Sequence, residues 1–145
     1  MGYERIREHD CTECTRNTCV VVREKKSQYR LENPAGKEIC RTQIDGCYLS
    51  QGKKCDWLLV DCEPENAYFV ELKGTDFRHA IEQINATINY VEGDLDSFDF
   101  FARVVLTKSP TPFLRNTPDV LKFEKRLRKR RGNLKTKTNL FVESV

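Results

Sequence analysis

Two apolar runs joined by a polar turn limit most strongly what this chain can fold into. Residues 56–61 (DWLLVD) form a near-continuous apolar run between two acids, and residues 68–73 (YFVELK) mix aromatic, β-branched and charged side chains. Aromatic and β-branched residues favour strands. The connecting residues 62–67 (CEPENA) are rich in turn-forming residues. The sequence therefore predicts an antiparallel hairpin.

An amphipathic pattern follows the hairpin directly. Apolar residues recur at helical spacing over about four turns, at Phe77, Ile81, Ile84, Ile88 and Val91. Thr75 or Asp76 can cap the start of this helix, and Gly93 stands where a left-handed C-cap would end it. We predict a helix between these positions.

The rest of the chain offers weaker patterns. Residues 44–49 (IDGCYL) predict a strand with a turn or bulge at Gly46, residues 101–107 another buried strand, and residues 140–142 a closing strand. Val120, Phe123 and Leu127 form the apolar stripe of a final helix. Residues 1–19 suggest a turn-rich entry, and residues 20–22 (VVV) fit a strand or a helix. The predicted order is strand, strand, strand, helix, strand, helix, strand.

Length and composition predict one folded domain. The 145 residues can bury one sizeable core, and 39% hydrophobic with 32% charged residues is typical of a folded protein rather than a disordered one. No apolar run approaches the ~20 residues of a membrane-spanning helix. The first residues carry charge instead of a signal-peptide apolar run. We therefore expect a cytoplasmic protein with no membrane partner.

The net charge of +3 is unevenly distributed. Residues 1–121 hold 16 basic and 20 acidic residues, whereas residues 122–145 hold 9 basic and 2 acidic ones. A basic segment on an acidic body suits a polyanionic partner such as nucleic acid. The expected phosphate contacts are Lys122, Lys125, Arg126, Arg128, Lys129 and Arg130. A solvated helix face is the alternative interpretation.

The seven cysteines indicate thiols or metal ligands rather than disulfides. Their number is odd and no secretory signal is evident, so we propose no disulfide from the sequence. Cys11, Cys14 and Cys19 have half of a zinc-site spacing, with Cys40 or Cys47 available as a fourth ligand. A structural Zn²⁺ is one reading. The other is free thiols that behave as small apolar residues, which suits Cys47, Cys55 and Cys62.

The hairpin brings charged side chains together. If the turn is centred between residues 64 and 65, Asp56 lies opposite Lys73, and alternation places Asp56, Glu71 and Lys73 on one face. Two carboxylates suit Mg²⁺, which can polarise a phosphoryl oxygen and acidify a bound water, while a lysine offsets developing charge. A cross-strand pair on an exposed sheet face would produce the same pattern without chemistry.

These residues resemble the PD-(D/E)XK, or restriction-endonuclease-like, superfamily. The resemblance covers about residues 38–107 and rests on residues 55–60 (CDWLLV) and 71–74 (ELKG). It implies an α/β fold with an αβββαβ core, in which a central mixed sheet is flanked by helices. The basic segment, with its predicted helix and strand, forms an extension to this core over residues 118–145. It also implies that Asp56, Glu71 and the Leu72 carbonyl bind Mg²⁺ or Mn²⁺, with Lys73 catalytic.

The resemblance extends to the helix after the hairpin. The helicase-associated exonuclease branch of this superfamily has a glutamine and a tyrosine there, which Gln83 and Tyr90 would supply, so Gln83 joins the predicted catalytic residues. A glutamate from a first helix would correspond to Glu32 or Glu38. Cys55 stands where the superfamily usually has proline.

A metal-dependent endo- or exonuclease is the predicted function, a phosphodiesterase with DNA as the expected substrate. The main alternative is a catalytically inactive module of the same fold that binds nucleic acid or a protein. A small metal-stapled interaction protein is a third reading. The oligomeric state stays open, and a homodimer is compatible with the sequence.

Overall fold

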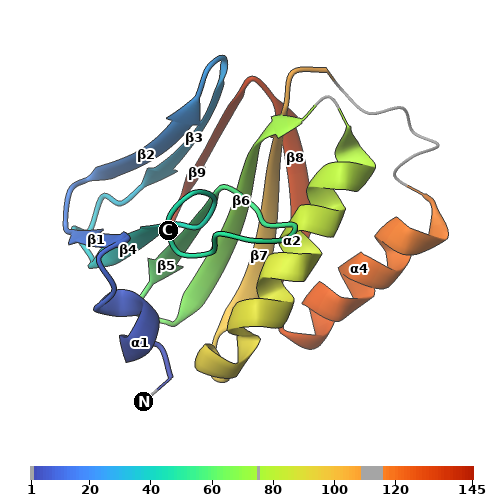
Figure 1. Cartoon of the computed structure of the whole chain (residues 1–145). Helices are drawn as coiled ribbons and strands as arrows, with labels where there is room; N and C mark the ends of the chain where they lie inside the picture. Colours follow the sequence, from blue (N-terminus) through green and yellow to red (C-terminus); the bar gives the residue numbers. More distant parts are fainter. Residues whose placement is uncertain (1, 75, 109–115) are drawn as a thin grey trace.

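The chain forms two β-sheets and a layer of helices (Figure 1). The computed structural model describes residues 2–74, 76–108 and 116–145, with the backbone alone at residues 73 and 74. The larger sheet has the strand order β1 (Thr12–Thr15), β4 (Ile39–Gln43), β5 (Trp57–Asp61), β6 (Asn66–Gly74), β7 (Asp99–Leu106) and β8 (Leu134–Thr138). The smaller sheet has the order β2 (Cys19–Glu24), β3 (Ser27–Glu32) and β9 (Leu140–Ser144).

The six-stranded sheet is mixed. Its first four strands, β1, β4, β5 and β6, pair antiparallel, whereas β6, β7 and β8 are parallel neighbours. Helices make the parallel crossovers: α2 (Phe77–Val91) and the 3-10 turn η1 (Glu92–Asp94) connect β6 to β7, and α4 (Pro118–Lys129) precedes β8. A short α1 (Glu4–Arg7) opens the fold. The predicted mixed α/β class is therefore confirmed.

Both faces of the large sheet are covered. Helices α2 and α4 lie side by side on one face, and the small sheet packs on the other (Figure 1). On β5, Leu58 and Val60 join the core under the helices, whereas Leu59 joins the core under the small sheet. Burial on both faces explains why β5 is an almost continuous apolar run. The prediction of flanking helices is right for one face only, because β2, β3 and β9 cover the other.

A buried ionic contact joins the two sheets. Arg103 on β7 is 2% exposed, and its Nε donates to Glu143 on β9 at 2.6 Å. The hydroxyl of Tyr29 on β3 donates to the same carboxylate oxygen at 2.5 Å. The Arg103 guanidinium also donates to the Asn133 carbonyl and side chain. This network holds β3 and the C-terminal strand β9 of the small sheet against β7 of the large sheet.

The predicted hairpin is confirmed, but its register differs by two residues. Trp57 pairs with Val70 and Asp61 with Asn66, so the turn is centred between residues 63 and 64. The Asp61 carboxylate accepts the Glu63 N–H at 3.1 Å, and Glu65 takes a left-handed conformation with φ 78°. This hydrogen bond and this backbone conformation form the turn, and Asn66 is the first residue of β6. A two-residue shift leaves the faces unchanged.

Several other predictions are confirmed. Asp76 caps α2, since its side chain accepts the His79 N–H at 3.1 Å. Strand β7, helix α4 and strand β9 form where the sequence predicts them, and the open segment 20–22 is a strand, within β2. The predicted left-handed C-cap at Gly93 is wrong, because the chain continues from α2 into the 3-10 turn η1.

The predicted strand over residues 44–49 is wrong. The N–H groups of Tyr48 and Leu49 bond back to the carbonyls of Gln43 and Ile44, which closes this segment into turns. Gly46 has φ 83°, a left-handed conformation that glycine adopts at low cost. The first core strand is instead β4, just before this turn. Strands β1, β3 and β8 are additional elements that the sequence did not indicate.

Two disulfides correct the prediction of free or metal-bound cysteines. Cys11 bonds to Cys47, and Cys14 bonds to Cys40, which lies directly opposite it on the β1–β4 ladder at a Cα–Cα distance of 3.9 Å. Cys11 and Cys14 thus have different partners, and Cys19 is an exposed free thiol. These three residues do not form the suggested zinc site. Cys55 and Cys62 are free thiols, as the alternative reading expected.

No helix among the described residues has the length and apolar character needed to cross a membrane.

Candidate functional site

Asp56 and Glu71 meet at one end of the β5–β6 ladder. Asp56 directly precedes Trp57, whose partner is Val70, and Glu71 directly follows Val70. The two side chains are 4% and 1% exposed. Strand alternation places them with Leu58 and Phe69, on the face that α2 covers. The carboxylate pair predicted from the sequence is therefore brought together, with Asp56 next to Glu71 rather than Lys73.

Backbone contacts hold Asp56 in place. Its Oδ2 accepts the N–H of Leu72 at 2.8 Å, and its own N–H donates to the Val70 carbonyl at 3.2 Å. The Asp56 carbonyl accepts the N–H of Ile44 at 2.9 Å. A carboxylate that accepts a buried backbone N–H is both oriented and favoured in its charged form. One carboxylate edge of Asp56 is thus fastened to β6.

Two residues of α2 fasten the segment that leads to Asp56. Thr87 is fully buried, and its Oγ1 accepts the Cys55 N–H at 2.8 Å while donating to the Gln83 carbonyl at 2.9 Å. The Gln83 Nε2 donates to the Lys54 carbonyl at 3.1 Å. Gln83 therefore lies beside the predicted site. Thr87 was missed, although its spacing of four residues from Gln83 puts both on one helix face.

Both carboxylates of the candidate site act on the neighbouring residue Cys55. Burial raises the pKa of the Cys55 thiol well above its ordinary value, and the nearby charges of Glu71 and Asp56 raise it further. Cys55 is therefore a neutral thiol at physiological pH. It acts as a small buried side chain of the core under α2.

The remaining predicted residues lie as follows. The Leu72 side chain is buried under the small sheet, and its backbone borders Asp56. Lys73 lies on β6, but its side chain is outside the described residues. Tyr90 is 59% exposed. Neither Glu32 on β3 nor Glu38 before β4 comes from a helix, so the predicted first-helix glutamate is wrong for both.

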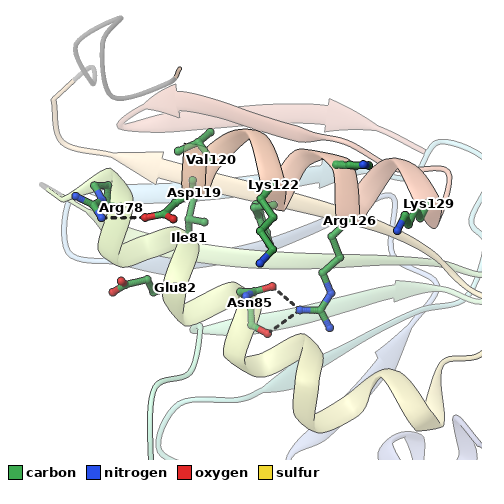
Figure 2. A pocket seen from close by; sticks show the side chains of 11 residues that line it. Arg78, Ile81, Glu82, Asn85, Asp119, Val120, Lys122, Arg126 and Lys129 are labelled. Carbon is green, nitrogen blue, oxygen red and sulfur yellow. Dashed lines mark hydrogen bonds and ion pairs between the residues drawn. The ribbon is translucent and has the colours of Figure 1, made fainter. Parts of the chain in front are cut away.

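A basic groove of about 610 Å³ runs between α2 and α4 (Figure 2). Its apolar floor includes Ile81, Val120 and Phe123. Two acidic side chains line it, Glu82 and Asp119. Five basic side chains also line it: Arg78, Lys122, Lys125, Arg126 and Lys129. Asp119 is paired with Arg78 at 3.0 Å, and Glu82 with Lys53 at 3.1 Å. The groove therefore carries an excess of positive charge.

The six predicted basic residues separate into two groups. Arg126 bonds to Asn85, Asn89 and Glu92, which ties α4 to α2 and η1. The Arg130 guanidinium donates to the carbonyls of Leu95, Asp96 and Phe98 and lies over the Phe100 ring. Within the described part of the chain, Lys122, Lys125, Arg128 and Lys129 make no ion pair and are exposed. Three of these four lysine and arginine side chains face the groove, and Arg128 does not.

A second group of metal-ligand residue types lies near α1. One ligand atom from each of Glu38, Cys40 and Cys62 falls within 4.8 Å of the others. Cys40 is bonded to Cys14, however, and Arg7 donates to both Glu38 oxygens at 2.5 and 2.8 Å. This guanidinium occupies the position that a cation would need. Asp56 and Glu71 are therefore the better candidates for a metal.

Comparison of the chain with protein-family models, with curated proteins and with solved structures finds no match. Its chemistry is therefore inferred from its own residues and their positions.

Proposed function

We propose that this chain is a metal-dependent nuclease that hydrolyses phosphodiester bonds of nucleic acid, with DNA as the expected substrate. The observation that carries the proposal is the pair of buried carboxylates, Asp56 and Glu71, at adjoining positions on neighbouring strands. Carboxylates are seldom buried without a function or a partner. The alternative from the sequence was a cross-strand pair on an exposed sheet face, which does not describe carboxylate side chains that are 4% and 1% exposed.

The order of elements supports the same proposal. The succession β4, β5, β6, α2 and β7 follows the βββαβ part of the core that the restriction-endonuclease-like resemblance implies. In that core the aspartate begins the second strand and the glutamate lies on the third. Here Asp56 directly precedes β5, and Glu71 lies on β6. The preceding helix of that core has no counterpart between β3 and β4 among the described residues.

The donor atoms of the site fit Mg²⁺ or Mn²⁺. Both ions prefer oxygen ligands and are commonly held by one or two carboxylates together with water. Asp56 and Glu71 would hold the ion, and the Leu72 carbonyl stays a predicted third ligand. The ion would supply polarisation of the phosphoryl oxygen and a more acidic water. Gln83 and Thr87 act by holding residues 54–55, and so Asp56, in position. The catalytic role of Lys73 remains a prediction from the sequence.

The experiment measures hydrolysis of single- and double-stranded DNA and RNA with Mg²⁺, with Mn²⁺ and with EDTA. We expect metal-dependent cleavage by the native chain. The variants Asp56→Asn, Glu71→Gln and Lys73→Ala should lose at least about a hundredfold in rate, a loss typical of removing one contact to a transition state. Circular dichroism and thermal unfolding establish that each variant is folded.

Asp61→Asn is the matched control. Asp61 is also buried on β5, but it lies at the other end of the strand and pairs with Lys37 at 2.6 Å. Asparagine keeps an acceptor for the Glu63 N–H, and cleavage should persist. If the folded native chain cleaves no substrate, the catalytically inactive binding module becomes the better reading. Equal cleavage by Asp56→Asn and the native chain would place the active site elsewhere.

A further inference from the structure

A free thiol lies beside one of the two disulfides. Cys62 directly follows β5 and is half-buried, whereas Cys40 is fully buried on β4 and bonded to Cys14 on β1. The sulfur atoms of Cys62 and Cys40 lie within 4.8 Å of each other. Disulfides exchange when a third sulfur attacks one of the bonded pair. The three sulfurs are thus placed for exchange without a large movement of the sheet.

Arg7 contacts the sulfur that would attack, on Cys62, and the sulfur that would be attacked, on Cys40. Its Nη1 lies 3.6 Å from the Cys62 sulfur and 3.9 Å from the Cys40 sulfur. The bidentate contact with Glu38 holds the guanidinium in this place. A fixed positive charge stabilises a thiolate and the charged arrangement through which exchange proceeds. Arg7 is therefore a positioning and charge-stabilising residue for this step.

Both ends of the three-sulfur row reach the surface. Cys62 lines an open pocket of about 1030 Å³ together with Tyr3, Arg7 and Glu65. Cys14, at the other end, is half-buried and lines a smaller pocket of about 230 Å³. The attacking thiol can therefore lose its proton to solvent, and the leaving sulfur can gain one.

We propose that Cys62, Cys40 and Cys14 form a thiol–disulfide exchange site. The Cys62 thiol releases its proton, and its sulfur forms a bond with the Cys40 sulfur. The Cys40–Cys14 bond breaks, its electron pair leaves on the Cys14 sulfur, and Cys14 takes up a proton. One disulfide and one thiol are present before and after, so no oxidant or reductant is consumed. The covalent link moves from β1–β4 to β4 and the end of β5. Strand β1 then keeps its ladder to β4 and the Cys11–Cys47 disulfide directly before it, but loses its own covalent bond to β4.

The charges around Cys62 set the pH dependence. Four titratable groups act on this thiol: Tyr3 directly before α1, Arg7 on α1, Glu38 before β4 and Asp61 on β5. Burial raises the pKa of Cys62, Glu38 raises it further, and Arg7 lowers it. The thiol is therefore mostly protonated at neutral pH. Exchange should accelerate by about tenfold per pH unit until that pKa is reached, because the thiolate is the attacking form.

Disulfide mapping tests the proposal. The chain, carrying Cys19→Ser to remove the exposed thiol, is incubated from neutral to alkaline pH with a low concentration of iodoacetamide. It is then acid-quenched and digested with trypsin. The fragment 38–41, which carries Cys40, should be found linked to 8–16, which carries Cys14, and also to 55–73, which carries Cys62. Alkylated Cys14 should accumulate with time. The Cys11–Cys47 disulfide is the internal reference and should stay intact.

Three variants make the outcome decisive. In Cys62→Ser the link to 55–73 and the alkylated Cys14 should both disappear, which excludes Cys55, the other cysteine of that fragment. Arg7→Gln should slow exchange about tenfold, whereas Arg5→Gln, an exposed arginine on the same helix, should leave the rate unchanged. Two outcomes would overturn the proposal. In the first, fragment 38–41 is linked only to 8–16 at every pH. In the second, its link to 55–73 persists in Cys62→Ser. Equal rates in the two arginine variants would remove Arg7 from it.

Discussion

Thr87 offers the sharpest test of how α2 holds the candidate site. Its hydroxyl is fully buried, accepts the Cys55 N–H at 2.8 Å and donates to the Gln83 carbonyl at 2.9 Å. Thr87→Val keeps the shape of the side chain and removes the hydroxyl. The Cys55 N–H then has no acceptor from this side chain in a buried position, which costs about 1–3 kcal/mol. Valine and threonine have similar helix propensities, so helix formation is not a further difference.

The magnitude can be compared with a variant that changes packing alone. Thr87→Ser keeps the hydroxyl and removes one buried methyl group, a loss of about 0.8 kcal/mol. We therefore expect Thr87→Val to lower the free energy of unfolding by about 2 kcal/mol, and Thr87→Ser by less than half of that. For a domain of this size the valine variant should unfold about 4–8 °C lower.

Urea unfolding, followed by circular dichroism, measures both effects. If only a local interaction is lost, the slope of the free energy of unfolding against urea concentration should be the same as in the native chain. If the site has the proposed activity, cleavage should fall in Thr87→Val at a temperature where it is fully folded, because Cys55 immediately precedes Asp56. Thr87→Ser should keep it. A valine variant as stable as the native chain, or a serine variant that is the less stable of the two, would refute this reasoning.

Two further predictions concern the groove and α1. The first substitutes Gln for the groove lysines Lys122, Lys125 and Lys129 in a cleavage-deficient Asp56→Asn chain. Binding of single-stranded DNA, measured by fluorescence anisotropy, should then depend less on salt. The slope of log K against log salt concentration should fall in magnitude by about 2. The control substitutes Gln outside the groove, at Arg128, Lys135 and Lys137. It changes the net charge equally and should leave the slope near that of the parent. Equal slopes in both triple variants would contradict phosphate binding in the groove. The Arg7 guanidinium lowers the pKa of Glu38; a carboxyl whose pKa is lowered on folding stabilises the fold above its unfolded pKa and loses this contribution as pH falls through the folded pKa. Urea unfolding should therefore show a stability gap between the native chain and Glu38→Gln at pH 7 that shrinks below about pH 4.5, and a gap independent of pH would contradict the prediction.

Strong local patterns made part of the fold predictable. Strand β5 is buried on both faces, and α2 has an apolar stripe with a capping Asp76, so composition and spacing sufficed for each. Strand β3 follows a period of two as well, with Tyr29 and Leu31 buried on alternate positions. The polar and charged residues Gln28, Arg30 and Glu32, which alternate with them, hid this pattern. Strand β8 was missed because lysines and threonines alternate along a partly exposed edge strand.

The candidate site was predictable in its residue types and less so in its contacts. A shift of the β5–β6 pairing by an even number of residues leaves Asp56 and Glu71 on the same face of the sheet. The two-residue error in the predicted register therefore did not separate them. The disulfides depend instead on which strands are neighbours. Cys14 can bond to Cys40 only because β1 pairs with β4, and neither strand was predicted. Long-range pairing of this kind leaves no local signal in the sequence.

The strand that carries Glu71 is held from the face opposite the site. Its neighbours Val70 and Leu72 are buried under the small sheet, whose strands come from residues 19–32 and 140–144. Residues 38–107 alone would therefore expose these side chains, together with Leu59 and Val105, to water. Exposure of several large apolar side chains costs about 1.5–3 kcal/mol each, a sum comparable with the whole stability of a small domain. Residues 38–107 are consequently not a self-sufficient folding unit, and the terminal segments belong to the structure that positions the carboxylate pair.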